Sequence, residues 1–235
     1  MAAIPKAQVV AAKAQVFAAL ALRARIEANP DHPRAEALRD RSASWLRKVG
    51  AWEVAVEPQE EYIFAAPLGG LASGPLSDCQ WAGEDVAVLA WALGLGERPT
   101  EWETVNATPL TAALRFMQGD GEAIRQQVCL RPVEELRDYF KRLSVVRWAT
   151  HEVRLKRGGP ADPRSLGVLG KVLRERLGNA GVTLSDADLA AGRAEIRRIG
   201  PNGLTGDSPI PGLLVVRQLA AEWIVGGRSP FWSDA

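Results

Sequence analysis

The pattern of apolar and polar residues is most informative near the middle of the chain. Every residue from Val86 to Leu93 is apolar, so a helix over this stretch has no face left for water and must be buried. Gly94 is suited to end such a helix. Ser77 and Gln80 form a capping-box pattern, which places the beginning of the helix near residue 77. The pattern therefore predicts a buried central helix over about residues 77–94.

Further helices are predicted on both sides of this stretch. After Pro5, apolar residues recur at helical spacing through an Ala-rich segment, which indicates an amphipathic helix. Residues 196–204 are compatible with a small β-hairpin whose tip is Pro201-Asn202-Gly203. The fold class is thus mainly α, a single-domain multi-helix orthogonal bundle around the central helix. The other expected helices cover about residues 5–29, 33–48, 57–66, 108–117, 131–157, 163–177, 185–191 and 212–225.

The length and composition favour one ordinary globular domain. A chain of 235 residues, 47% hydrophobic and 24% charged, can bury a sizeable core. We predict a single helical domain over residues 1–235, and the helices within residues 5–50 are open to packing as a semi-separate extension. No stretch approaches the length of about 20 apolar residues that a membrane span needs. The start resembles a signal peptide only faintly, so we expect a soluble cytoplasmic protein without a membrane partner.

The charge balance and the few ligand-forming residues exclude several classes of function. Lys and Arg number 29 against 28 Asp and Glu, so no net field favours nucleic acid or an anionic surface. Cys79 and Cys129 are too few for a disulfide framework and are expected to be reduced, buried thiols. With only His32 and His151 besides, no zinc-ligand spacing is present. We expect no metal and no cofactor.

Three short motifs suggest chemistry but are incomplete. Gly206-Asp207-Ser208 is similar to a hydrolase nucleophile block, yet Pro209 follows and few histidines could act as the base. His151-Glu152 lacks the second histidine of a metalloprotease helix. Gly94-Leu95-Gly96 has no third glycine and follows a helix, unlike a dinucleotide loop. None of the three therefore predicts an activity.

One polar residue of the central helix is the best candidate for a site. Glu84 lies on the same side of that helix as its tryptophans, and a lone buried carboxylate costs several kcal/mol unless it is paired. Arg147 and Arg217 border the apolar stripes of later helices, and His151 is one turn beyond Arg147. Two interpretations stay open. Glu84 could bridge to an arginine and hold helices together, or these four residues could line a cleft with a base or an anion site.

Six segments form a recognisable set: Ala66 to Leu71, Trp81 to Leu95, Pro132 to Leu136, Arg147 to Ala149, Val215 to Ile224 and Phe231 to Asp234. Together they resemble a bacterial family known only as domain of unknown function 4272. The resemblance covers roughly residues 65–235, and this chain has Glu222 where the family usually has Asn. It implies a mostly helical fold and brings no activity, cofactor or functional residue with it.

The functional expectation is a non-catalytic protein that binds another protein. A toxin-neutralising (immunity) protein or a secretion accessory would have such a sequence, because it occupies a partner and needs no reacting group. Trp102, Phe231 and Trp232 are the aromatic residues that could anchor an interface. The first alternative is an enzyme with an uncharacterised Glu/Arg/His cleft, and the second is a nucleic-acid-binding protein, whose binding would depend steeply on salt.

Overall fold

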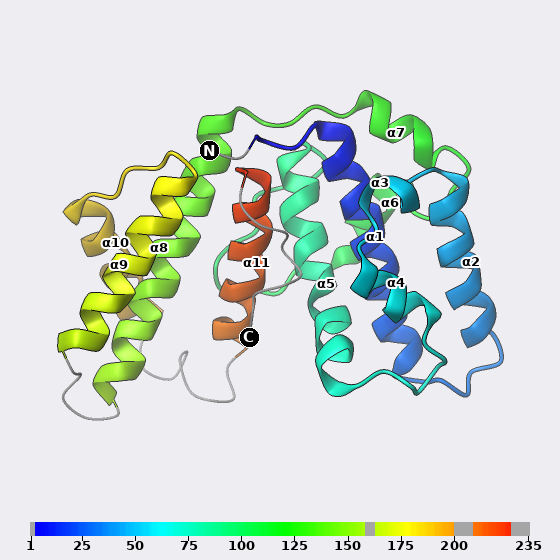
Figure 1. Cartoon of the computed structure of the whole chain (residues 1–235), viewed down its shortest axis with the longest axis horizontal. Coiled ribbons are helices and arrows are strands. Elements are labelled where there is room, and N and C mark those ends of the chain that lie inside the picture. Colours follow the sequence, from blue (N-terminus) through cyan, green and yellow to red (C-terminus); the bar gives the residue numbers. More distant parts are fainter. Residues whose placement is uncertain (1–2, 158–162, 200–208, 227–235) are drawn as a thin grey trace. The chain divides into compact units, whose positions relative to one another are not determined.

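The computed structural model describes residues 3–157, 163–199 and 209–226. These residues form eleven α-helices and no strand, which confirms the mainly α fold class (Figure 1). The helices belong to two compact units. The N-terminal unit comprises Pro5–Pro99 and Thr104–Arg131, and the C-terminal unit comprises Thr100–Glu103 and the chain from Pro132 onward, with the first four residues. Each unit is described by itself, and the prediction of a single domain stays a prediction.

Two long helices make the centre of the N-terminal unit. α1 (Ala7–Glu27) and α5 (Ser73–Ala92) share the most extensive helix–helix contact of the described chain (Figure 1). The N-terminal helices therefore pack directly on the predicted central helix. The shorter helices of this unit are α2 (Ala35–Lys48), α3 (Trp52–Ala55), α4 (Pro58–Ala65), α6 (Ala107–Ala113) and α7 (Gly121–Gln127).

The predicted burial of the central helix is confirmed. Every residue from Glu84 to Leu93 is buried, and Gly94 follows α5 with a φ of 73°, a left-handed conformation that glycine adopts without strain. The predicted beginning of the helix is wrong. α5 starts at Ser73, one turn before Ser77, because the first turn of a helix tolerates Pro75, whose missing N–H would have no partner there.

The amphipathic interpretation of α1 is also wrong. All residues from Val10 to Leu20 are buried, because α1 contacts α2, α3, α5, α6 and α7. The polar side chains of this buried stretch, Lys13 and Gln15, are bonded to other protein groups. Gln15 Nε2 donates to the backbone carbonyls of Leu114 (3.1 Å) and Gly121 (2.8 Å). Polar positions spaced like a solvated face can therefore lie in a core when loops supply their partners.

The C-terminal unit is organised around α8 (Val133–Arg157). α9 (Pro163–Asn179), α10 (Asp186–Ile199) and α11 (Ile210–Ile224) each pack on α8 (Figure 1). Close approach of α10 to α8 depends on Gly192, since a Cβ there would lie 2.5 Å from Val145 Cγ1. Residues 196–199 belong to α10, so the predicted hairpin does not begin there, and its tip lies outside the described residues.

Other expectations have mixed outcomes. Cys79 is buried as predicted, but Cys129 is exposed, because it lies in the segment between α7 and α8 that no helix covers. Among the described residues, no helix is long and apolar enough to cross a membrane. The same part of the chain holds no group of three or more His, Cys, Asp or Glu side chains that could bind a metal ion.

Candidate functional site

The four residues of the predicted polar cluster fall into both units. Glu84 belongs to the N-terminal unit, where it is buried and accepts a hydrogen bond from the backbone N–H of Val105 at 2.9 Å. Arg217 belongs to the C-terminal unit, is completely buried, and donates from Nη2 to the Glu103 carbonyl at 2.6 Å. Convergence of Glu84 with Arg147, His151 and Arg217 stays a prediction.

Arg147 and His151 do line one pocket, which opens between α8, α9 and α11. Four positions apart on α8, they lie on the same helix face, as the sequence indicated. Arg217 does not line this pocket, whose volume is about 120 Å³. We refer to it as the α8/α9/α11 pocket. Its lining residues are Ser144, Arg147, Trp148, His151, Leu169, Val172, Leu173, Arg176 and Gln218.

The polar side chains of this pocket are mostly hydrogen-bond donors. Arg147 Nη1 donates to Gln218 Oε1 at 2.6 Å, and Gln218 Nε2 donates to Ser144 Oγ at 3.1 Å. Within the described residues, Arg147 has no carboxylate at ion-pair distance, whereas Arg176 pairs with Glu222 at 3.3 Å. Burial and the nearby Arg176 lower the pKa of Arg147, although a guanidinium stays charged at neutral pH. The pocket is therefore positively charged.

The imidazole of His151 and the indole of Trp148 have different surroundings in the pocket. Burial, then Arg147 and Arg154, lower the pKa of His151 below 6.5, so its imidazole is neutral at pH 7. The indole Nε1–H of Trp148 is buried and has no acceptor among the residues described here. The guanidinium of Arg193 lies 4.7 Å from the Trp148 ring centroid, a cation–π contact. A buried donor without an acceptor carries a desolvation penalty of about 1–3 kcal/mol.

Nucleophilic catalysis does not follow from the hydroxyl and imidazole of this pocket. Ser144 and His151 are seven positions apart on α8, which corresponds to roughly 10 Å along a helix. A nucleophile and its base must be within hydrogen-bond reach, roughly 3 Å. The pair therefore cannot act as a catalytic dyad in this structure.

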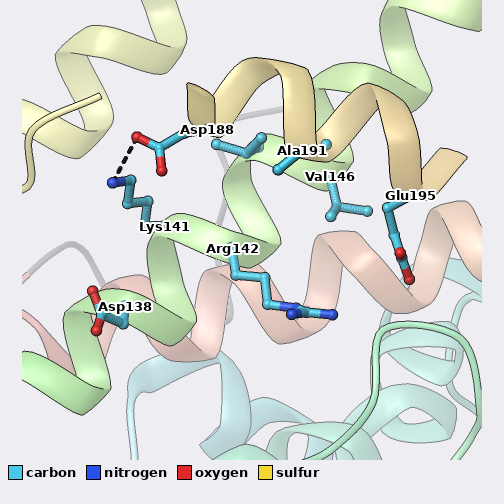
Figure 2. A pocket seen from close by; sticks show the side chains of 9 residues that line it. Asp138, Lys141, Arg142, Val146, Asp188, Ala191 and Glu195 are labelled. Carbon is cyan, nitrogen blue, oxygen red and sulfur yellow. Dashed lines mark ion pairs between the residues drawn. The ribbon is translucent and has the colours of Figure 1, made fainter. Parts of the chain in front are cut away.

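A second, larger cleft lies between α8 and α10. It has a volume of about 330 Å³, and Figure 2 shows Asp188 and Lys141 joined across it. Four of its five charged side chains have a charged partner: Lys141 Nζ lies 2.7 Å from Asp188 Oδ2, Arg142 pairs with Glu101, and Glu195 pairs with Arg198. Glu195 accepts hydrogen bonds at 2.8 Å from Arg198 and from Trp102, one of the predicted interface aromatics. A cleft neutralised in this way offers a ligand few free groups.

The other two predicted interface residues, Phe231 and Trp232, lie outside the described residues. Trp102 is half-buried, and its indole N–H is engaged with Glu195. Its role as an interface residue stays a prediction.

The family model described as "Domain of unknown function (DUF4272)" matches residues 1–176 of this chain. The chain belongs to this family. The DUF4272 match includes the N-terminal helices, which the resemblance described above did not cover, and it ends within α9. Consequently the late segment Val215 to Ile224 lies beyond it. No curated protein and no solved structure matches the chain.

A buried ionic cluster within the DUF4272 region was missed by sequence reasoning. Lys13 Nζ lies 2.7 Å from Glu60 Oε1 and 3.2 Å from Glu57 Oε1, and donates to the Ala55 carbonyl at 3.1 Å. Lys13, Glu60 and Asp85 are all buried. The three come from α1, α4 and α5, so no local spacing in the sequence relates them. The capping box of α4, Glu57 with Glu60, was the only local signal.

The buried carboxyl group of Asp85 is expected to make the stability of the chain depend on pH. Burial, only partly offset by Lys13, raises its pKa well above 3.8, so the folded chain favours the neutral acid. Its contribution is therefore fully present below pH 4 and is lost as the pH rises toward the folded-state pKa. We expect Asp85→Asn to gain stability relative to the wild type as the pH rises from 4.5 to 7.5, because the amide has no proton to lose.

Urea unfolding at both pH values measures this difference. Glu61→Gln, which replaces an exposed carboxylate on α4, is the control and should follow the wild type at both pH values. Parallel pH dependences for Asp85→Asn and the wild type would show that Asp85 is charged in the folded protein.

Proposed function

We propose that this protein is a non-catalytic protein-binding protein whose partner docks over the α8/α9/α11 pocket. The volume of the pocket is the observation that carries the proposal. Small-molecule and cofactor sites usually have volumes of about 300–1,000 Å³, whereas this pocket has about 120 Å³. A space of that size admits a single side chain. A protein partner would supply such a side chain together with the contacts around it.

The surroundings of the pocket support a protein partner. Val172 lines it and is 43% exposed, and Val168, one turn earlier on α9, is 60% exposed. Leu155, one turn beyond His151 on α8, is 39% exposed. These are three of the five exposed large hydrophobic side chains in the described chain. Apolar side chains beside a partly buried arginine are typical of the central part of a protein interface.

The finer form of the proposal concerns the kind of partner. A protein that neutralises a toxin or assists secretion acts by occupying its target, and it needs no nucleophile or base. The separation of Ser144 from His151 is consistent with that mode of action. We include in the proposal a cytoplasmic location and a protein target, and place the enzyme and nucleic-acid alternatives behind it.

An affinity pull-down from the native extract, using the full chain, tests this proposal. We expect the wild type to retain a stoichiometric partner and the double variant Val168→Lys/Val172→Lys to retain it at least tenfold less. Lysine at these positions would place charge in the apolar part of the interface. Val54→Lys is the matched control, since Val54 is 49% exposed but lies in the N-terminal unit.

The melting temperatures of the variants should stay within a few degrees of the wild type, because the replaced side chains are exposed. The proposal fails if no stoichiometric partner is retained. It also fails if the α9 double variant and Val54→Lys retain the partner equally well.

A further inference from the structure

The α8/α9/α11 pocket contains more hydrogen-bond donors than acceptors. Arg147 donates one N–H group to the neutral amide of Gln218, and no carboxylate of the described residues lies at ion-pair distance from it. The indole N–H of Trp148 is buried and has no acceptor among the residues that the structure describes. Trp148 Nε1 is too deeply buried to be reached from the pocket. Arg147 is half-buried and lines the pocket, so its remaining N–H groups can donate to a ligand that carries acceptors.

The charges around the pocket indicate that this ligand is an anion. Arg147 and Arg154 on α8 and Arg176 on α9 are the cationic groups near His151, and Glu222 on α11 is the carboxylate that faces them. Glu222 is paired with Arg176. Arg147, which is half-buried, therefore has an incompletely compensated charge. A planar guanidinium is the side chain best suited to bind a carboxylate through two parallel hydrogen bonds.

The shape of the pocket indicates what carries the charge. Leu169, Val172 and Leu173 give it an apolar wall from α9, next to the polar residues of α8. Its volume of about 120 Å³ is close to that of a cavity of about 150 Å³ that admits benzene. This space accommodates a carboxylate on a stem of a few carbons and excludes a nucleotide.

From these observations we infer that the α8/α9/α11 pocket binds a carboxylate on a short apolar stem, with Arg147 as its donor and Trp148 as part of its wall. In the complex proposed above, on which this step rests, the carboxylate is the side chain of a glutamate of the partner protein. The partner's apolar residues then cover Val168 and Val172. The pocket thereby selects partners with an acidic side chain next to an apolar patch.

Butyrate is a suitable probe, because it reproduces the glutamate side chain, and butyramide has the same shape without the charge. We expect butyrate to shift the indole N–H resonance of Trp148 saturably in NMR spectra of the full chain, and butyramide at equal concentration not to. The resonance is identified by its loss in Trp148→Phe. Bound butyrate should also raise the pKa of His151, since a nearby negative charge stabilises the imidazolium.

Arginine variants test the assigned donor. We expect Arg147→Gln to weaken butyrate binding at least tenfold and to weaken partner capture similarly. The matched control is Arg174→Gln on α9, an exposed arginine that does not line the pocket, and it should bind butyrate like the wild type. Arg147→Lys keeps the charge without the planar group and should fall between the two. Unchanged melting temperatures show that each variant is folded.

The possible outcomes separate this inference from the proposed function. Equal effects of butyrate and butyramide, butyrate binding that survives Arg147→Gln, or a response to inorganic phosphate alone would overturn the carboxylate site. Partner capture that depends on Val168 and Val172 but is unaffected by Arg147→Gln would overturn it while leaving the proposed function intact. Butyrate binding without any captured partner would support the carboxylate chemistry and overturn the protein source of the carboxylate.

Discussion

Replacing Lys13 with methionine is expected to lower the free energy of unfolding by about 3–5 kcal/mol, the range for breaking a buried ion pair. Lys13 is 1% exposed, and its ammonium lies 2.7 Å from the carboxylate of Glu60, which is 0% exposed. Without Lys13 the Glu60 carboxylate would remain buried without its cation. In the wild type, burial raises the pKa of Glu60 even though Lys13 acts to lower it. Without Lys13 the Glu60 carboxyl group would therefore have to take up a proton or become hydrated.

Urea unfolding at pH 7 measures this effect, and a second substitution identifies its origin. Lys13→Met/Glu60→Gln removes both charges and keeps an acceptor for the Glu57 N–H, so we expect it to be more stable than Lys13→Met alone. Lys48→Met, at an exposed position of α2, is the control and should stay within about 0.5 kcal/mol of the wild type. A loss below 1 kcal/mol in Lys13→Met would mean that water or another group solvates Glu60.

Shortening a buried side chain of the central helix is expected to have the second large effect on stability. Leu89→Ala is expected to lower the free energy of unfolding by about 2–5 kcal/mol. Leu89 is 0% exposed and lies within the completely buried stretch of α5, against which α1 packs. Removing its terminal carbons leaves a cavity, because the surrounding helices can close over it only in part.

Leu76→Ala on the same helix is the matched control. Leu76 is only half-buried in the first turn of α5, so the same change of side chain should have a smaller effect, about 1 kcal/mol or less. Denaturant midpoints with unchanged m-values give the comparison. Similar losses at both positions would contradict the view that the second half of α5 is the buried centre of its unit.

Part of the candidate site could be predicted from spacing alone. Arg147 and His151 are one turn apart on α8, and this helical relation placed them correctly on one face. Two further polar groups of the pocket, Arg176 and Gln218, come from α9 and α11. Arg176 and Gln218 reach it only because those helices pack on α8, and nothing in their local sequence indicates that contact. The unmatched N–H of Trp148 likewise depends on what surrounds it in the fold.

The sequence by itself determined that this protein is helical, that residues 86–93 avoid water, and that a helix ends before Gly94, because periodicity, apolar runs and glycine act within one or two turns. Only the tertiary structure decided which polar residues are buried. Lys13 and Gln15 belong to a helix that the sequence predicted to be amphipathic, but a carboxylate of α4 and backbone carbonyls of distant segments bond them in the core. Burial of a charge depends on partners brought from remote segments, and such partners leave no local pattern in the sequence.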